Sequence, residues 1–253
     1  MYNFSALIDD GVAGDLEGKI EICSRLMIGN MEVDDMLDGS CIADFSGEQI
    51  ENCRNLLIRN NKKIVLLNCS KHVTEQEYYK KILRKGHLLG VENINVPVGN
   101  NDKLDEAFID GLKAVCEIGV AYGIRILLEN RSRTFLSTDK AVSQVCEKVR
   151  NQNTGLIFNP LEYARLKRHP FFHMFYNSRL KNDIRVLRVN DGLFKDGNPV
   201  FPARGNAEIK ELASILLARG FKGYFSFIPY FKNMDITIYM EVIENFKRLL
   251  MEM

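Results

Sequence analysis

Short apolar segments rich in β-forming residues alternate with longer stretches of helical spacing along most of this chain. Six such short segments follow one another from residue 62 onward, at 62–70, 91–99, 124–131, 154–160, 184–191 and 223–231. The stretches between them, such as 105–123 and 206–220, place apolar residues three and four positions apart, as an amphipathic helix does. Strands that are apolar on both faces and alternate with amphipathic helices are typical of a parallel sheet covered by helices.

The same alternation extends over the remaining parts of the chain. The predicted elements there are two strands, at 3–9 and 27–33, and three helices, at 16–26, 47–61 and 235–253. The total is eight strands and about eight helices, and no proline-rich or glycine-rich linker divides the 253 residues. About 250 residues is the usual size of an α/β barrel. We therefore predict one domain over residues 1–253, a single (β/α)8 TIM barrel of the α/β class.

An open, doubly wound sheet is the main competing fold. Such sheets usually show a glycine-rich phosphate loop after the first strand. The segment GDLEGKI, residues 14–20, superficially suggests a phosphate loop, but it lacks the four-residue gap and the following Ser or Thr. The barrel is therefore favoured, and no nucleotide site is expected.

The net charge of the chain bears on the class of binding partner, and its cysteines bear on the cellular compartment. The chain has 34 Lys and Arg against 33 Asp and Glu, a formal net charge of +1, which gives no electrostatic basis for a nucleic-acid or membrane partner. No secretory signal and no membrane-spanning run is visible. Six scattered cysteines without a C-x-x-C pair indicate reduced thiols in a cytoplasmic protein. The oligomeric state stays open, with a homodimer as one option.

Polar residues gather where the predicted strands end. In TIM barrels the functional groups lie at the carboxyl-terminal strand ends, where the loops converge. Glu129, Asn159, Arg188 and Asp191 each follow closely on an apolar strand, where a charge or amide needs a partner. The other polar candidates from these strand ends and the adjoining loops are His72, Arg131, Arg133, Glu162, Asn190 and Arg204. We expect all of them at one rim.

These strand ends resemble those of the xylose isomerase-like TIM-barrel superfamily, which holds the sugar phosphate isomerases and epimerases. The likeness runs from about residue 62 to the end of the chain. GIRILLEN resembles the family's strand-five segment, which ends in a metal-binding Glu, here Glu129. TGLIFNP and IRVLRVNDG resemble the strand-six and strand-seven segments, and residues 202–228 resemble the glycine-rich loop, helix and last strand.

The departures from the family pattern concern its metal ligands and its second catalytic Glu. Asp191 and Glu129 match. The replacements are Asn159 for the strand-six Asp, Glu162 for the following His, Arg188 for the strand-seven His, Asn190 for the Lys and Ile228 for the final Glu. A divalent ion requires about three or more charged or imidazole ligands. We therefore expect no metal cofactor; if Mg, Mn or Zn were bound, its ligands would be Glu129, Glu162 and Asp191.

Arg188 offers a different partner for Glu129. A guanidinium carries a permanent charge and a fork of donors that fits a carboxylate, so Arg188 is expected to neutralise Glu129 where the family uses a metal. Arg131, Arg133 and Arg204 add positive charge above the same rim. The ligand implied is a small anionic carbohydrate or sugar acid, and His72, Asn159 and Asn190 are further candidates for contacting it.

The resemblance implies an isomerase or epimerase that moves a proton beside a carbonyl group. Two Glu residues perform this step in the family, so a one-base reaction remains here, with Glu129, Glu162 or Asp191 as the base and Arg188 as the electrostatic stabiliser. The alternative is a barrel that has lost catalysis and serves as a ligand-binding or protein-interaction module. Fold alone does not choose between the two.

Overall fold

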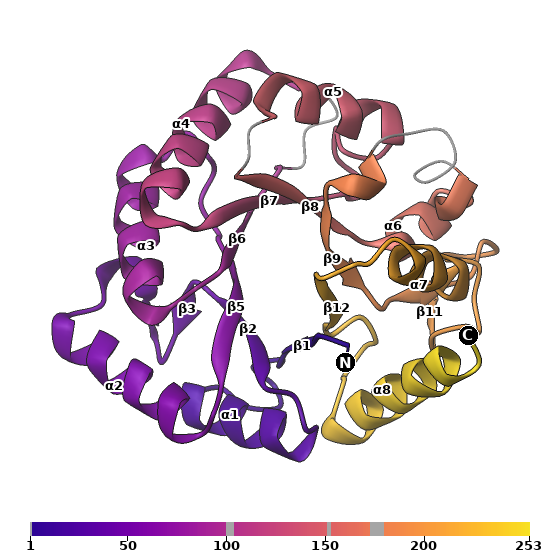
Figure 1. Cartoon of the computed structure of the whole chain (residues 1–253), viewed down its shortest axis with the longest axis horizontal. Coiled ribbons are helices and arrows are strands. Elements are labelled where there is room, and N and C mark those ends of the chain that lie inside the picture. The colour runs from indigo at the N-terminus through magenta and orange to yellow at the C-terminus, as the bar shows by residue number, and fades with distance from the viewer. Residues whose placement is uncertain (1, 100–103, 151–152, 173–179) are drawn as a thin grey trace.

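The computed structural model describes residues 2–99, 104–150, 153–172 and 180–253, and it confirms the predicted barrel. The eight barrel strands are β1 (Phe4–Leu7), β2 (Asn30–Asp34), β5 (Lys63–Asn68), β6 (Asn93–Val96), β7 (Arg125–Glu129), β8 (Thr154–Phe158), β9 (Ile184–Arg188) and β12 (Tyr224–Phe227). They pair in parallel and close in the order β1-β12-β9-β8-β7-β6-β5-β2 (Figure 1). Seven of them lie within a segment predicted as a strand, and β2 extends one residue beyond the segment predicted at 27–33.

The helices lie outside the strands and surround the barrel (Figure 1). They are α1 (Leu16–Arg25), α2 (Gly47–Arg59), α3 (Gln76–Leu89), α4 (Glu106–Tyr122), α5 (Asp139–Val149), α6 (Pro160–Arg165), α7 (Ile209–Ala218) and α8 (Ile236–Met251). Side-chain oxygens satisfy a free backbone N–H at the first turn of several of them, and Ser46 and Gln49 form a reciprocal capping box on α2. These caps fix where the helices begin.

Two short antiparallel pairs beside the barrel differ from the prediction. They are β3 (Met36–Leu37) with β4 (Ser40–Cys41), and β10 (Asp191–Gly192) with β11 (Pro199–Val200). The sequence predicted one strand over 184–191, whereas the barrel strand ends at Arg188 and Asp191 begins β10. Asp191 therefore belongs to a loop hairpin rather than to the barrel wall.

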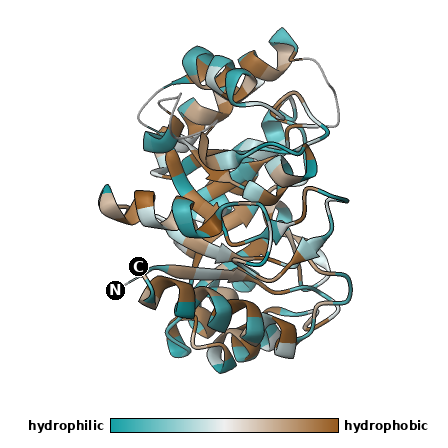
Figure 2. Ribbon diagram, turned by 90° about the vertical axis from the view of Figure 1, so that its right-hand side faces the viewer, coloured by the Kyte–Doolittle hydropathy of each residue, from teal (hydrophilic) through white to brown (hydrophobic). Residues whose placement is uncertain are grey.

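The helices are amphipathic, with hydrophilic and hydrophobic residues interleaved along them (Figure 2). In α4, for example, Phe108, Leu112, Val115 and Gly119 are all buried. Within the described ranges, no helix combines the length and the apolar character that crossing a membrane requires.

A small apolar layer fills the middle of the barrel. Its buried members come from four strands, and they are Val65, Leu66, Leu127, Ile157 and Val186. Because side chains alternate along a strand, Arg125, Leu127 and Glu129 of β7 point to the same side of the sheet. One strand thus places a guanidinium toward the amino-terminal end, an aliphatic group in the middle and a carboxylate toward the carboxyl-terminal end.

The contact of α4 with β7 depends on Gly119. A Cβ atom at this position would lie 2.7 Å from the carbonyl oxygen of Ile124 and 2.8 Å from Cδ1 of Ile126. The Gly119→Val variant is therefore expected to lower the free energy of unfolding by about 3 kcal/mol, as overpacking and backbone displacement combine. Denaturant unfolding followed by circular dichroism measures the change.

Gly47→Ala in the first turn of α2 provides the matched control. A Cβ atom at Gly47 meets nothing within 4 Å, so the stability of this variant should change by less than about 1 kcal/mol. Equal stabilities of the two variants would contradict the close packing of α4 on β7.

Candidate binding site at the carboxyl-terminal rim

A buried arginine occupies the centre of the carboxyl-terminal end of the barrel. Arg188, the last residue of β9, is 2% exposed. Its Nη1 atom donates to Glu32 of β2 and to Oγ of Ser226 at 2.6 Å, and its Nη2 atom donates to Oε2 of Glu129 at 3.1 Å. The expected pairing of Arg188 with Glu129 is confirmed, and the same guanidinium also binds a second buried carboxylate.

Neutral side chains hold the remaining oxygens of the two carboxylates. Ser5 Oγ donates to Oε1 of Glu32 at 2.7 Å. Asn159 Nδ2 donates to Oε1 of Glu129 at 3.0 Å, and Asn95 Nδ2 lies 3.4 Å from Oε2 of the same carboxylate. A buried carboxylate is tolerated when each of its oxygens accepts a hydrogen bond. This network supplies a donor to each of the four oxygens of Glu32 and Glu129.

The charges in this network keep Glu129 ionised. Burial by itself raises the pKa of Glu129, but the positive charges of Arg188 and Arg131 and the hydrogen bonds from Arg188 and Asn159 outweigh it, so the pKa lies below its usual range. Burial likewise opposes the charge on Arg188, yet Glu129 and Glu32 raise its pKa above the ordinary value. At neutral pH this pair is an ion pair.

A cavity with two lobes opens above the network. The acidic lobe, of about 450 Å³, is lined by Asp10, Asp34 and Asp35 among others. The basic lobe, of about 720 Å³, is lined by four basic residues, namely Arg131, Arg133, Arg165 and Lys232. Glu129, Arg131 and Ile228 line both lobes, so the two lobes adjoin each other.

Three buried amide oxygens beside this cavity lack a donor. The Oδ1 atoms of Asn95, Asn159 and Asn190 make no hydrogen bond within the described part of the chain. Asn95 lines the acidic lobe, whereas Asn159 and Asn190 line the basic lobe. A buried acceptor without a donor is costly, so a rotation of these amides that turned an oxygen toward the cavity would let it accept a ligand hydroxyl group.

Two of the predicted catalytic carboxylates, those of Glu162 and Asp191, bind partners other than Arg188. Glu162 lines the basic lobe, where it pairs with Arg165 and accepts the backbone N–H of Ser132 at 2.7 Å. Asp191 accepts the backbone N–H groups of Gly192, Gly205 and Ala207 at 2.8–2.9 Å and lines neither lobe. Asp191 thus fastens the loop that follows β10.

Of the remaining predicted ligand-binding residues, two line the cavity and two lie outside it. Arg131 and Arg133 line the basic lobe as described above. His72 lines neither lobe; its Nδ1 lies 2.9 Å from the hydroxyl of Thr74. Arg204 is exposed and also lines neither lobe. The structure therefore brings most of the predicted residues to one rim but leaves His72, Arg204 and Asp191 outside the cavity.

Sequence reasoning missed the acidic residues of β2 and the turn after it. Glu32 is 1% exposed and is the second partner of Arg188. Asp34 and Asp35 line the acidic lobe, where Asp35 accepts the backbone N–H of Ser70 at 2.9 Å. The signal was present, because charged residues that interrupt or end an apolar strand need partners. Glu32 interrupts the second predicted strand, and Asp34 and Asp35 directly follow it.

The residues at this rim do not fit the divalent metal that the family resemblance implies. Within the described ranges, no three His, Cys, Asp or Glu side chains gather closely enough to hold a cation. Glu162 and Asp191 do not join Glu129 in the ligand set considered for Mg, Mn or Zn, because Arg165 and backbone N–H groups hold them elsewhere. The guanidinium of Arg188 stands beside Glu129 instead and repels a cation.

Eight parallel strands that close into a ring inside a layer of helices define a TIM barrel, here with polar cavities at the carboxyl-terminal ends of its strands. A model of the xylose isomerase-like TIM barrel family matches residues 29–249, and the chain belongs to this family. None of the curated proteins compared with the sequence matches it.

Solved structures of sugar epimerases and related proteins share the fold at low sequence identity. A D-tagatose 3-epimerase-like protein is 16% identical with a TM-score of 0.77, and the match covers 98% of this chain and 97% of that one. The 3-keto-D-glucoside 4-epimerase from E. coli is 12% identical with a TM-score of 0.74, covering 98% and 100%. A xylose isomerase-like TIM barrel protein from Mycobacterium smegmatis in complex with magnesium is 15% identical with a TM-score of 0.73, covering 100% and 97%.

The buried ion network predicts a pH-dependent defect in the Arg188→Met variant. Removing the guanidinium leaves Glu32 and Glu129 buried without a counter-charge, so we expect a loss of about 3–5 kcal/mol of stability at pH 7. Without Arg188, the carboxylates favour the protonated state, and the defect should shrink as the pH falls toward 4. Denaturant unfolding of both proteins at several pH values measures this trend.

In the unchanged protein, the ion network has the opposite dependence on pH to the unpaired carboxylates of the variant, because its contribution to the free energy of unfolding decreases as the pH falls. Because the pKa of Glu129 is depressed in the folded state, its ionisation stabilises the fold above the unfolded-state pKa, and this contribution disappears as the pH falls through the folded-state value. A defect of Arg188→Met that stays constant from pH 4 to pH 7 would refute the electrostatic account of the network.

Proposed function

We propose that this chain binds and acts on a small carbohydrate acid at the carboxyl-terminal rim of the barrel, without a divalent metal. The observation that carries the proposal is the set of unpartnered amide oxygens of Asn95, Asn159 and Asn190 beside the cavity. These acceptors suit a ligand with several hydroxyl donors. Membership of the xylose isomerase-like family supports the same class of ligand.

The distribution of charge in the cavity supports an acid group on that carbohydrate. Arg131, Arg133 and Lys232 in the basic lobe supply donors and positive charge for a carboxylate or phosphate. Asp34 and Asp10 in the acidic lobe accept hydrogen bonds from hydroxyl groups. A ligand with an acid group at one end and hydroxyl groups along its length matches both lobes at once.

Glu129 is suited to binding rather than to proton abstraction. Its pKa lies below the usual range, and donors from Arg188, Asn159 and Asn95 occupy its oxygens. A general base works best with a pKa near the working pH. The role of Glu129 as a catalytic base therefore stays a prediction, and its contacts favour the positioning of the ligand.

A proton-transfer step at this site is assigned to Asp34. Its carboxylate lines the acidic lobe, and desolvation by the surrounding protein raises its pKa against the opposing hydrogen bond from Asn68. A raised pKa makes the carboxylate a stronger base at neutral pH. Arg131, which lines both lobes, is placed to stabilise negative charge that develops on a substrate oxygen.

Binding of a sugar acid should raise the midpoint of thermal unfolding. A ligand at about one hundred times its dissociation constant stabilises by about 2.7 kcal/mol, which corresponds to about 5–10 °C for a chain of this size. We expect D-glucuronate or D-glucose 6-phosphate to produce such a shift and neutral D-glucose a much smaller one. Arg133→Gln should reduce the shift caused by the acids.

Arg204→Gln is the matched control, because this exposed arginine lines neither lobe and its loss should leave the shift unchanged. EDTA, or added Mg²⁺, Mn²⁺ or Zn²⁺, should not alter the midpoint or the response to the acids. A metal-dependent response would overturn the metal-free proposal. No response to any carbohydrate would instead favour a protein-interaction module.

Catalysis at Asp34 predicts exchange of a substrate proton with solvent. With keto sugar acids such as 5-keto-D-gluconate in D₂O, the protein should introduce deuterium at the carbon beside the carbonyl group, and NMR spectroscopy detects this exchange. Asp34→Asn should reduce the exchange rate at least about a hundredfold while binding persists. Exchange that survives in Asp34→Asn would exclude Asp34 as the base.

A further inference from the structure

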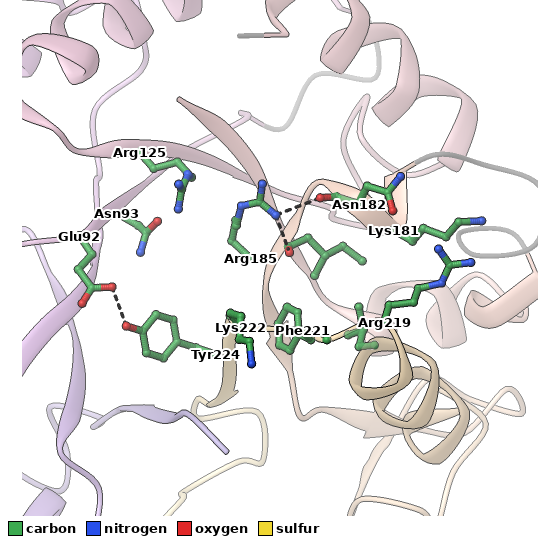
Figure 3. A pocket seen from close by; sticks show the side chains of 14 residues that line it. Glu92, Asn93, Arg125, Lys181, Asn182, Arg185, Arg219, Phe221, Lys222 and Tyr224 are labelled. Atoms are coloured by element: carbon green, nitrogen blue, oxygen red, sulfur yellow. Dashed lines mark hydrogen bonds between the residues drawn. The ribbon is translucent and has the colours of Figure 1, made fainter. Parts of the chain in front are cut away.

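A second cavity lies at the opposite, amino-terminal end of the barrel. It has a volume of about 480 Å³ and is lined by the first residues of β6, β7, β9 and β12 and by the end of α7. Neither the sequence predictions nor the proposed function uses any of these residues. Figure 3 shows Arg125 and Arg185 on one flank of the opening, with Arg219 and Lys222 on the other.

The charge of this cavity contrasts with the balance of the whole chain. Its lining includes five basic residues and one acidic residue, whereas the complete chain has a net charge of only +1. The basic residues are Arg125, Lys181, Arg185, Arg219 and Lys222. The single carboxylate, Glu92, is already engaged, because it pairs with Lys63 at 3.0 Å and accepts the Tyr224 hydroxyl at 2.6 Å. Positive charge therefore dominates the space.

Arg125 and Arg185 are close enough to repel each other. The pKa of Arg185 is lowered by burial and then by the charge of Arg125, with Asp183 opposing the shift. The Nη1 atom of Arg185 donates to the carbonyl oxygens of Asn182 and Ile184 at 3.0 and 3.3 Å, which are neutral acceptors, so only the charge of Asp183 is shown to offset it. Like charges held together at a cavity wall favour an anion between them.

Two buried polar atoms at the wall have no partner in the described ranges. They are Nε of Arg125 and Oδ1 of Asn93, whose side chain is 3% exposed and donates from Nδ2 to the carbonyl oxygen of Val65. An unpaired guanidinium N–H is a donor for an anionic oxygen, and the amide oxygen is an acceptor for a P–OH group. Protein encloses both atoms, so they would meet the acidic oxygens of a ligand once their side chains turn toward the cavity.

We propose that this amino-terminal cavity is a second ligand site, which takes a small multivalent anion of the phosphate type. The guanidinium groups of Arg125 and Arg185 bind the acidic oxygens from one flank, and Arg219 and Lys222 bind them from the other. The apolar layer around Leu127 and Val186 separates this site from the rim cavity. The two sites can therefore be tested independently of each other.

Isothermal titration calorimetry of the full chain with inorganic pyrophosphate tests this site. In about 0.15 M chloride, which screens weak surface attraction, we expect binding at one site. Arg185→Gln and the more exposed Lys222→Gln should each weaken the affinity about tenfold, since each removes a charge-assisted hydrogen bond. The thermal midpoints of both variants establish that they fold.

Arg133→Gln at the rim is the matched control. Because the proposed rim site requires hydroxyl groups beside the acid group, Arg133→Gln should leave pyrophosphate binding unchanged while it weakens the response to sugar acids. Arg185→Gln should show the reverse pattern. Loss of pyrophosphate binding in Arg133→Gln alone would place the anion at the rim and overturn the second site. No binding, or equal binding by the unchanged protein, Arg185→Gln and Lys222→Gln, would overturn it as well.

Discussion

The ion network centred on Arg188 is the constraint on which the carboxyl-terminal end of this barrel depends. A continuous set of hydrogen bonds links one side chain from each barrel strand or from the residue that directly follows it. Its members are Ser5, Glu32, Asn68, Asn95, Glu129, Asn159, Arg188 and Ser226. A buried charge tolerates few alternative arrangements, so this network fixes the relative positions of the strands at the floor of the cavity.

The network also decides the chemistry available above it. One guanidinium compensates two carboxylates in the place where the family resemblance implies a cation, and it keeps Glu129 ionised. A carboxylate in this state accepts hydrogen bonds well and abstracts protons poorly. The accessible groups above the floor, Asp34 on one side and Arg131 with Arg133 on the other, therefore define what a ligand meets.

Strand alternation gives the two ends of the barrel different characters. Along β7 the inward-facing series runs from Arg125 through Leu127 to Glu129, and the aliphatic layer in the middle separates two polar ends. At the carboxyl-terminal end the charges are paired in a closed network. At the amino-terminal end, Arg125 and Arg185 line a cavity whose described lining contains five basic residues and one carboxylate, that of Glu92. The same fold thus supports two chemically distinct cavities.

The barrel and one half of its central ion network can be predicted from the amino-acid sequence. The alternation of strands and helices predicted all eight barrel strands, because burial on both faces imposes continuous apolar runs. It also predicted the pairing of Arg188 with Glu129, since both charges end such runs. The role of Glu32, which lies 156 residues away from Arg188, follows from the folded chain, because barrel closure brings β2 within reach of β9. The directions of the loop side chains could not be predicted from the sequence either. Asp191 and Glu162 point to backbone donors and to Arg165, partners that loop conformation creates and that spacing along the chain does not encode.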